Sequence, residues 1–248
     1  MSSNTWPSRL CLVRHGESAG NVARDFAEAN GQERIALTHR DVDIPLSERG
    51  EGQAAALGRW MAGLPEQERF DCVWVSPYVR AQQTAVHALK AGGLDLPVVV
   101  DERLREREFG VLDGLTRKGI IALYPEESER RTAIGKFYHR PPGGESWTDA
   151  ALRTRSVTTD LRAGWSGKRT MVIAHQVVVL LFRYVIEGMT EAQILEIDKQ
   201  ADVANCAWTM YAQDGDELPQ LVGYNQVQHL EEQAAPVTTE PDAPHGPR

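Results

Sequence analysis

Two histidines, two arginines and a cluster of glutamates in this chain each follow a short apolar run. In chain order they are Arg14, His15, Arg80, Glu102, Glu106, Glu108 and His175. Short apolar runs bounded by polar residues are typical of buried strands. In an open sheet of parallel strands, the residues that follow the strands meet at the edge where ligands bind. We therefore expect these side chains to form one site.

Such a set of side chains suits the transfer of a phosphoryl group. The guanidinium of arginine is a planar fork that binds phosphate oxygens bidentately, and a helix beginning near Gly16 would add backbone N–H donors. A histidine nitrogen can attack phosphorus, because neighbouring cations favour its neutral form. The same cations stabilise charge during the transfer, and a carboxylic acid can protonate the leaving oxygen.

Strands alternate with helices along the sequence that must position these residues. The expected strands are residues 10–13, 72–75, 98–100, 171–174, 206–211 and 221–224. The expected helices are residues 16–30, 47–64, 79–91, 146–163 and 176–187, with Ser47 as one cap and Ser146 or Thr148 as another. In the first helix, Val22, Phe26 and Ala29 share a face. The alternation predicts an α/β fold, a three-layer α/β/α sandwich with a mainly parallel sheet.

The sequence predicts a single domain over residues 1–230. The chain has 248 residues, 42% of them hydrophobic and 25% charged, which is enough for one core. Residues 113–142, here called the excursion, depart from the alternation and contain one expected helical piece at 120–123. Residues 231–248 carry four prolines and little to bury, so we expect a disordered tail.

The composition of the chain argues against some classes of binding partner and favours one cellular compartment. The net charge of −8 argues against a nucleic-acid or membrane partner. The most apolar window, residues 177–186, is interrupted by Arg183 and is shorter than the roughly 20 residues of a membrane span. No secretory signal is recognised at the start. The three cysteines, Cys11, Cys72 and Cys206, lack metal-ligand spacing and are typical of reduced core residues in a cytoplasmic protein.

The segment RHGESAGN at 14–21 resembles the signature of the histidine phosphatase superfamily, which includes cofactor-dependent phosphoglycerate mutases and many phosphatases. The likeness covers residues 10–224. The other motifs that carry it are DIPLSERGEGQA at 43–54, SPYVRAQQTA at 76–85, LREREFGVLDG at 104–114, GGES at 143–146 and VIAHQ at 172–176. The resemblance implies a phosphoglycerate mutase-like sheet and a reaction that uses no metal or cofactor.

The resemblance also assigns roles to individual residues. His15 matches the phosphorylated nucleophile, and Glu106 matches the proton donor, a choice among three glutamates that spacing does not make. The residues that match the phosphate pocket are Arg14, Asn21, Arg80 and His175. The excursion falls where the family inserts segments that cap the pocket and set specificity. We name Arg24, Arg40, Arg107, Tyr138, His139 and Arg140 as candidates for the mouth of the pocket.

Gln176 departs from the family pattern, because most members have glycine after the second histidine. We place it with the phosphate- and substrate-binding residues, since the AHQ form resembles the fructose-2,6-bisphosphatase domain, as does YPEE at 124–127. Those domains have a lysine before GES where this chain has Gly143. We therefore do not assign fructose 2,6-bisphosphate to this chain as its substrate. The chain also lacks the GxxxxGK[ST] phosphate loop of the kinase half.

The leading hypothesis is a phosphomonoesterase that hydrolyses a small phosphorylated metabolite through a phosphohistidine on His15. The GGES segment resembles phosphatase members and supports this choice. The alternative is a phosphoglycerate-type mutase with the same intermediate, and a third hypothesis is a non-catalytic sensor of phosphorylated ligands. The oligomeric state stays open, a homodimer included.

Overall fold

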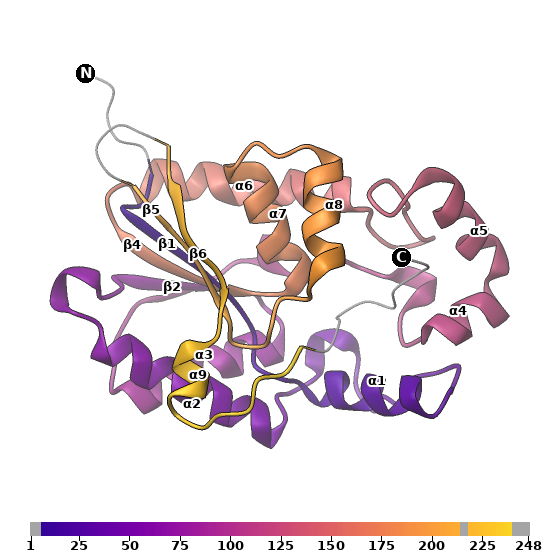
Figure 1. Cartoon of the computed structure of the whole chain (residues 1–248), viewed down its shortest axis with the longest axis horizontal. Coiled ribbons are helices and arrows are strands. Elements are labelled where there is room, and N and C mark those ends of the chain that lie inside the picture. The colour runs from indigo at the N-terminus through magenta and orange to yellow at the C-terminus, as the bar shows by residue number, and fades with distance from the viewer. Residues whose placement is uncertain (1–5, 214–217, 240–248) are drawn as a thin grey trace.

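The computed structural model describes residues 6–213 and 218–239, which form a six-stranded mixed sheet with helices on both faces (Figure 1). The strand order is β3-β2-β4-β1-β5-β6. The parallel strands are β1 (Arg9–Arg14), β2 (Cys72–Val75), β3 (Val98–Val100) and β4 (Arg169–Ala174). The antiparallel strands β5 (Trp208–Ala212) and β6 (Gln220–Gln226) complete one edge. The sheet is mainly parallel, as the sequence predicts.

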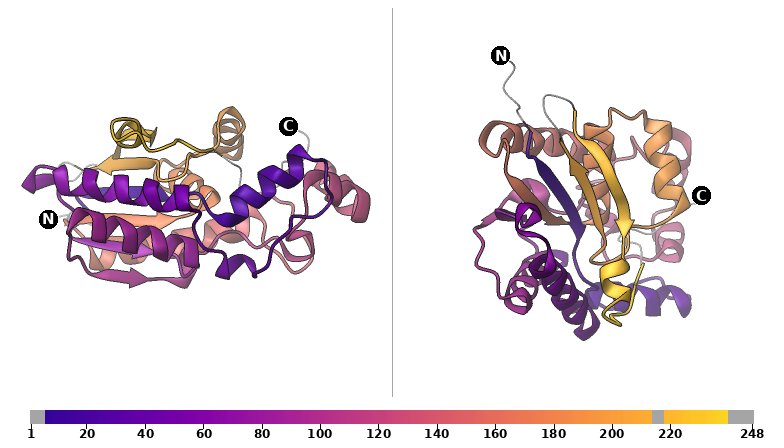
Figure 2. Two further views of the ribbon diagram at one scale, coloured as in Figure 1. Left: turned by 90° about the horizontal axis from the view of Figure 1, so that it is seen from below. Right: turned by 60° about the vertical axis from the view of Figure 1, so that its left-hand side comes forward.

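Helices cover the sheet in two layers, one on each face (Figure 2). The side chains of the strands alternate between these two layers. In β1, Leu10 and Leu12 pack toward the layer of α6 (Trp147–Gly164), α7 (Gln176–Ile186) and α8 (Glu191–Gln200). Cys11 and Val13 pack toward the layer of α2 (Glu48–Gly63) and α3 (Val79–Gly92). A strand places successive side chains on opposite faces, so this pattern confirms the three-layer sandwich.

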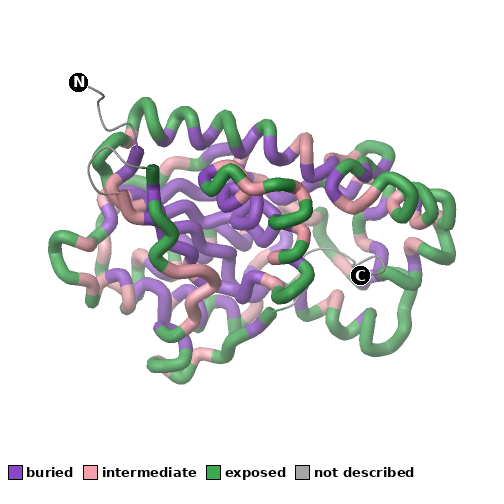
Figure 3. Tube along the Cα trace, turned by 45° about the horizontal axis from the view of Figure 1, so that its top comes forward, coloured by how far each residue is buried: buried purple, intermediate pink, exposed green. Residues whose placement is uncertain are grey.

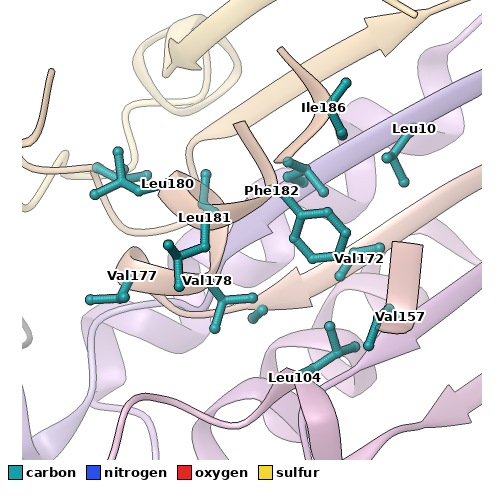
Figure 4. Close-up of a cluster of buried hydrophobic side chains, with 14 of the residues drawn as sticks. Leu10, Leu104, Val157, Val172, Val177, Val178, Leu180, Leu181, Phe182 and Ile186 are labelled. Carbon is teal, nitrogen blue, oxygen red and sulfur yellow. The ribbon is translucent and has the colours of Figure 1, made fainter. Parts of the chain in front are cut away.

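The larger core lies between the sheet and α7. Figure 4 shows its side chains, which include Leu181 and Phe182 of α7 with Val172 of β4. In Figure 3 the buried segments gather at the sheet and at the inward faces of the helices. Both expected caps are confirmed: the Oγ of Ser47 accepts from the N–H of Gly50, and that of Ser146 accepts from the N–H of Asp149.

Helix α1 (Ala19–Ala29) begins later than expected and buries a different face. Asn21 and Ala27 are its buried residues, whereas Val22 and Phe26 are 47% and 61% exposed. The predicted face was wrong because α1 lies at the end of the molecule that also carries the excursion, away from the core (Figures 1 and 2). Residues near its start, including Gly20 and Asn21, line a pocket.

The excursion folds into two helices, α4 (Arg117–Leu123) and α5 (Pro125–Ile134). Only the first was expected, since the charged residues of α5 lack an apolar stripe. The excursion pairs with the segment after α1: the N–H of Ile35 donates to the carbonyl of Gly114 at 2.9 Å. Gly119 of α4 permits this approach, because a Cβ there would lie 1.8 Å from the carbonyl oxygen of Glu33. Helix α8 was also not predicted.

The expectation of a disordered tail from residue 231 needs correction for residues 231–239. They continue from α9 (Gln228–Glu231), and Thr238 is buried and hydrogen-bonded to Gln53 and Asn205. Hydrogen bonds to backbone and hydroxyl groups hold this segment. The prediction missed them because it was based on the small number of apolar residues in the tail. Residues 240–248 lie outside the described ranges. Among the described helices, none has the length and apolar character needed to cross a membrane, and the cytoplasmic location remains a prediction.

Candidate active site

The two histidines meet because their strands are neighbours. Strands β1 and β4 pair in parallel with Arg14 opposite Ala174, so His15 and His175 leave the sheet side by side. The N–H of His15 donates to the carbonyl of Ala174 at 2.9 Å. The imidazole rings lie edge to face with centroids 5.1 Å apart, and both residues are fully buried.

Hydrogen bonds define which nitrogen of His15 carries the proton. Nδ1 lies 2.7 Å from the carbonyl oxygen of Gly16, which can only accept, so Nδ1 is the protonated nitrogen. Nε2 lies 3.2 Å from Nε of Arg80, which donates to it. The lone pair of Nε2 therefore points toward the guanidinium of Arg80, where a phosphoryl group would be held.

Arg14 and the backbone of His15 are held by the loop that precedes β5. Nη1 of Arg14 donates to the carbonyl of Val203 at 2.6 Å. The N–H of Cys206 donates to the carbonyls of Arg14 and His15 at 3.0 and 3.3 Å. Cys206 takes a positive φ of 55° in making this contact. The loop encloses the buried Arg14 and fixes the turn that bears His15.

Arg80 lies in the first turn of α3 and is shared between His15 and an acidic residue. Its Nη1 donates to the backbone carbonyl of Asp41 at 2.6 Å and lies 3.0 Å from Oδ1 of the same residue. Nη2 lies 3.3 Å from Oδ2. The carboxylate of Asp41 therefore occupies the fork that would bind a phosphate. Sequence reasoning missed Asp41, which lies in a segment without a strand or α-helix.

His175 is held by residues that follow β2. Its Nε2 lies 2.8 Å from the Oγ of Ser76, and the ring of Tyr78 packs edge-on at 4.9 Å between centroids. The guanidinium of Arg80 also lies over the Tyr78 ring, 4.8 Å from its centroid. Ser76 and Tyr78 were not singled out from the sequence, although both belong to the motif that identified Arg80.

Glu106 is the one of the three glutamates that enters the site. It is 1% exposed, whereas Glu102 and Glu108 lie on the surface. Its Oε1 accepts from the N–H of Arg107 at 2.7 Å. Arg153 of α6 supports this turn, since its guanidinium donates to the carbonyl of Glu106 at 3.2 Å and to neighbouring carbonyls. Burial therefore favours Glu106 over the other two glutamates as the proton donor that the resemblance implies.

Glu106 and Arg80 line one open pocket, with about 440 Å³ of empty space, between α1 and the excursion. Its other lining residues are Ser18, Gly20, Asn21, Arg24, Ile35, Leu37, Asp41, Ile44, Phe109 and Asp113. The carboxyl of Asp113 has a raised pKa because desolvation by the surrounding protein and the charge of Asp41 both disfavour its ionised form. The lining of the pocket thus combines two arginines with carboxyl and apolar groups.

Asn21 and Gln176 differ in their placement. Asn21 lines the pocket, and its Oδ1 accepts from the N–H and the Oγ–H of Ser18 in a capping box at the start of α1. Gln176 is buried at the first position of α7, and its Nε2 donates to Oδ1 of Asp202 at 2.8 Å. Gln176 is therefore tied to the loop that holds Arg14, while Asn21 stands at the pocket itself.

Of the six candidates for the mouth, Arg24 lines the pocket. The others have separate surroundings. Arg40 pairs with Asp43 on the surface, Arg107 lies over the Phe109 ring, His139 bonds to Glu127, Arg140 pairs with Asp149, and Tyr138 is exposed. Desolvation lowers the pKa of His139 despite its bond to Glu127.

The fold agrees with the comparison with known families. The chain matches the histidine phosphatase superfamily (branch 1) over residues 10–227, and it belongs to that family. It is 33% identical to the 2,3-bisphosphoglycerate-dependent phosphoglycerate mutase of Methylobacterium radiotolerans, over 78% of this chain and 86% of that protein. It is 30% identical to the 6-phosphofructo-2-kinase/fructose-2,6-bisphosphatase of Caenorhabditis elegans, over 86% of this chain and 43% of that larger protein.

Two solved structures show the same architecture. The mycobacterial glucosyl-3-phosphoglycerate phosphatase in complex with VO3 superposes with a TM-score of 0.67 at 26% identity, covering 89% of this chain and all of that one. The alpha-ribazole phosphatase of Shigella flexneri superposes with a TM-score of 0.71 at 23% identity, over 88% and 96% of the two chains. The second likeness concerns the fold alone.

Proposed function

We propose that this member of the histidine phosphatase superfamily is a phosphomonoesterase acting on a small phosphorylated metabolite. One observation carries the proposal: Nε2 of His15 faces the guanidinium of Arg80 while Nδ1–H is held by the carbonyl of Gly16. A neutral imidazole with its lone pair directed at a bound phosphoryl group is a nucleophile.

The reaction has two steps on this geometry. Nε2 of His15 attacks phosphorus, the ester P–O bond breaks, and the carboxyl group of Glu106 gives its proton to the leaving oxygen. Water then gives a proton to the carboxylate of Glu106 and attacks phosphorus, and the P–N bond breaks. Arg14, Arg80, His175 and Asn21 are the proposed phosphate ligands, and Arg80 must exchange Asp41 for the phosphate.

The pocket walls favour a leaving group without a carboxylate. Among the described lining residues, two arginines are accompanied by three carboxyl groups. Glu106 carries a proton in the first step, so Asp41 and Asp113 are the carboxyl groups left to oppose a substrate carboxylate. We expect Arg80 to bind the phosphate, so Arg24 is the remaining lining arginine that could bind a carboxylate of the leaving group. A neutral alcohol, such as a sugar or polyol, meets less repulsion there than a glycerate. The 26% identity to a phosphatase structure supports hydrolysis, but it does not bear on this choice of leaving group, because the substrate in that protein's name contains a glycerate.

A second candidate is a phosphoglycerate-type mutase, favoured by the 33% identity to such enzymes over most of the chain. A mutase passes the phosphoryl group from His15 to a second hydroxyl and must keep water away from it. The two candidates therefore differ in the acceptor and share the phosphohistidine.

The test is incubation with p-nitrophenyl phosphate and a panel of sugar and glycerate phosphates, for wild type and His15→Ala. We expect inorganic phosphate from wild type without a bisphosphorylated primer, and none above background from the variant. Equal rates from both proteins contradict the proposal. Isomerisation of phosphoglycerate that requires a primer supports the mutase, and binding without labelling of His15 supports the sensor.

A further inference from the structure

Residues 232–239, here called the strap, lead from α9 to the back of the loop that carries His15. Thr238 is 7% exposed, while Val237 and Thr239 on either side are exposed. The family match ends at residue 227, so the strap lies outside the part of the chain that defines the superfamily. Two branches of hydrogen bonds connect it to the nucleophile.

The first branch passes through Gln53 of α2, which is fully buried. Its Nε2 donates to the carbonyl of Pro236 at 2.8 Å and to the Oγ1 of Thr238 at 2.9 Å. Since a carbonyl can only accept, these contacts orient the side-chain amide of Gln53. Its Oε1 is thereby directed to the N–H of Glu17, at 2.8 Å.

The N–H of Glu17 and the carbonyl of Gly16 belong to the same peptide unit. A peptide is planar, so fixing its N–H fixes the direction of its carbonyl. That carbonyl is the acceptor of Nδ1–H of His15. The loop is also tightly packed here, because a Cβ on Gly50 would lie 2.0 Å from the carbonyl oxygen of Glu17. The orientation of the Gln53 amide therefore influences the tautomer of His15 through one rigid unit, the peptide between Gly16 and Glu17.

The second branch passes through Asn205, which is also fully buried. The Oγ1–H of Thr238 donates to its Oδ1 at 2.9 Å, and the N–H of Asn205 donates to the carbonyl of Thr238 at 2.9 Å. Nδ2 of Asn205 then donates to the backbone carbonyl of His15 at 3.0 Å. The hydroxyl of Thr238 serves both branches, as a donor in one and an acceptor in the other.

We propose that the strap positions the nucleophile, and that Thr238 and Gln53 are positioning residues for the Nδ1–H tautomer of His15. The inference rests on the proposed role of His15 in phosphoryl transfer. Displacing the strap lowers the rate of transfer and leaves the pocket residues unchanged. A segment beyond the family domain thus controls the reactive imidazole.

The experiment compares Thr238→Val, which removes the hydroxyl at constant shape, with Thr238→Ser, which keeps it. Thr239→Val is the matched control on the exposed neighbour. We expect Thr238→Val to lower kcat for p-nitrophenyl phosphate about tenfold at little changed KM, and Thr238→Ser and Thr239→Val to stay near wild type. In ¹⁵N spectra of the imidazole, Thr238→Val should raise the share of the Nε2–H form of His15.

A folded Thr238→Val protein with wild-type kcat and tautomer overturns the inference, and so does an equal loss in Thr239→Val. A chain shortened to end at Ala235 serves as a second variant if Thr238→Val does not fold; the same loss is expected, and wild-type behaviour overturns the inference. The spectra need no turnover. A wild-type protein that forms no phosphohistidine therefore defeats the proposed function, while a tautomer that responds to Thr238→Val still supports the strap.

Discussion

Nε of Arg80 lies 3.2 Å from Nε2 of His15, while both terminal nitrogens of the same guanidinium face the carboxylate of Asp41. One side chain thus links the nucleophile to an acidic residue on a different segment. The relationship has two consequences: the activity should depend on the shape of Arg80, and the phosphate should compete with Asp41.

Arg80→Lys should lower kcat/KM for p-nitrophenyl phosphate about 100-fold or more. A lysine keeps the charge but lacks both the planar fork and the inner N–H that reaches His15. Steady-state kinetics measure the effect. Arg40→Lys is the control, because Arg40 is an exposed arginine paired with Asp43, and it should stay near wild type. Near-normal kcat/KM in Arg80→Lys contradicts the proposed role.

Asp41→Asn should strengthen inhibition by inorganic phosphate about fivefold. The carboxylate of Asp41 is partly exposed and competes for the fork of Arg80, and its removal leaves an uncharged competitor. The inhibition constant for phosphate, measured against p-nitrophenyl phosphate, reports the change. Asp43→Asn, two residues away in the same turn, provides the control. Weaker inhibition would show instead that Asp41 orients Arg80 for binding.

Glu106→Gln should slow the hydrolysis of alkyl phosphates by at least about 100-fold, with a much smaller effect on p-nitrophenyl phosphate. An alkoxide leaving group needs a proton, whereas p-nitrophenolate leaves without one. The comparison of the two substrates in one variant is the measurement. Glu102→Gln changes an exposed glutamate of the same segment and should affect neither. Equal losses on both substrates rule out the role of proton donor.

His229 should make the protein less stable in mild acid. Burial lowers its pKa from 6.5 to about 4, so between these values the unfolded chain binds more protons than the folded one. Stability is therefore present above pH 6.5 and lost as the pH falls toward 4, by up to about 3 kcal/mol.

Urea unfolding of His229→Phe at pH 7 and pH 5 tests this linkage. The phenyl ring keeps the contact with Trp60, whose ring centroid lies 5.5 Å from that of His229, and cannot titrate. The variant should lose less stability than wild type between the two pH values. His39→Gln changes an exposed histidine and should retain the wild-type loss. An unchanged pH dependence in His229→Phe assigns the acid sensitivity to other groups.

The sequence by itself determined the elements whose signals are local. Short continuous apolar runs identified β2 and β3 at their observed bounds, and a serine before a helical pattern identified the cap of α2. The histidines and arginines were found because each follows such a run. Their meeting at one sheet edge follows from parallel pairing, which the alternation of strands and helices predicts.

Only the tertiary structure decided which side chains share the site. Burial singled out Glu106, and Asp41 came to Arg80 from a segment without strand or α-helix. Thr238 is connected to His15 through Asn205, from more than 200 positions away in the sequence. The tertiary structure also determined which face of α1 is buried, and it showed that the charged segment of the excursion forms the helix α5. Periodicity reports how apolar residues recur within one segment. These contacts instead depend on how segments far apart in the sequence pack against each other, and no local pattern encodes that packing.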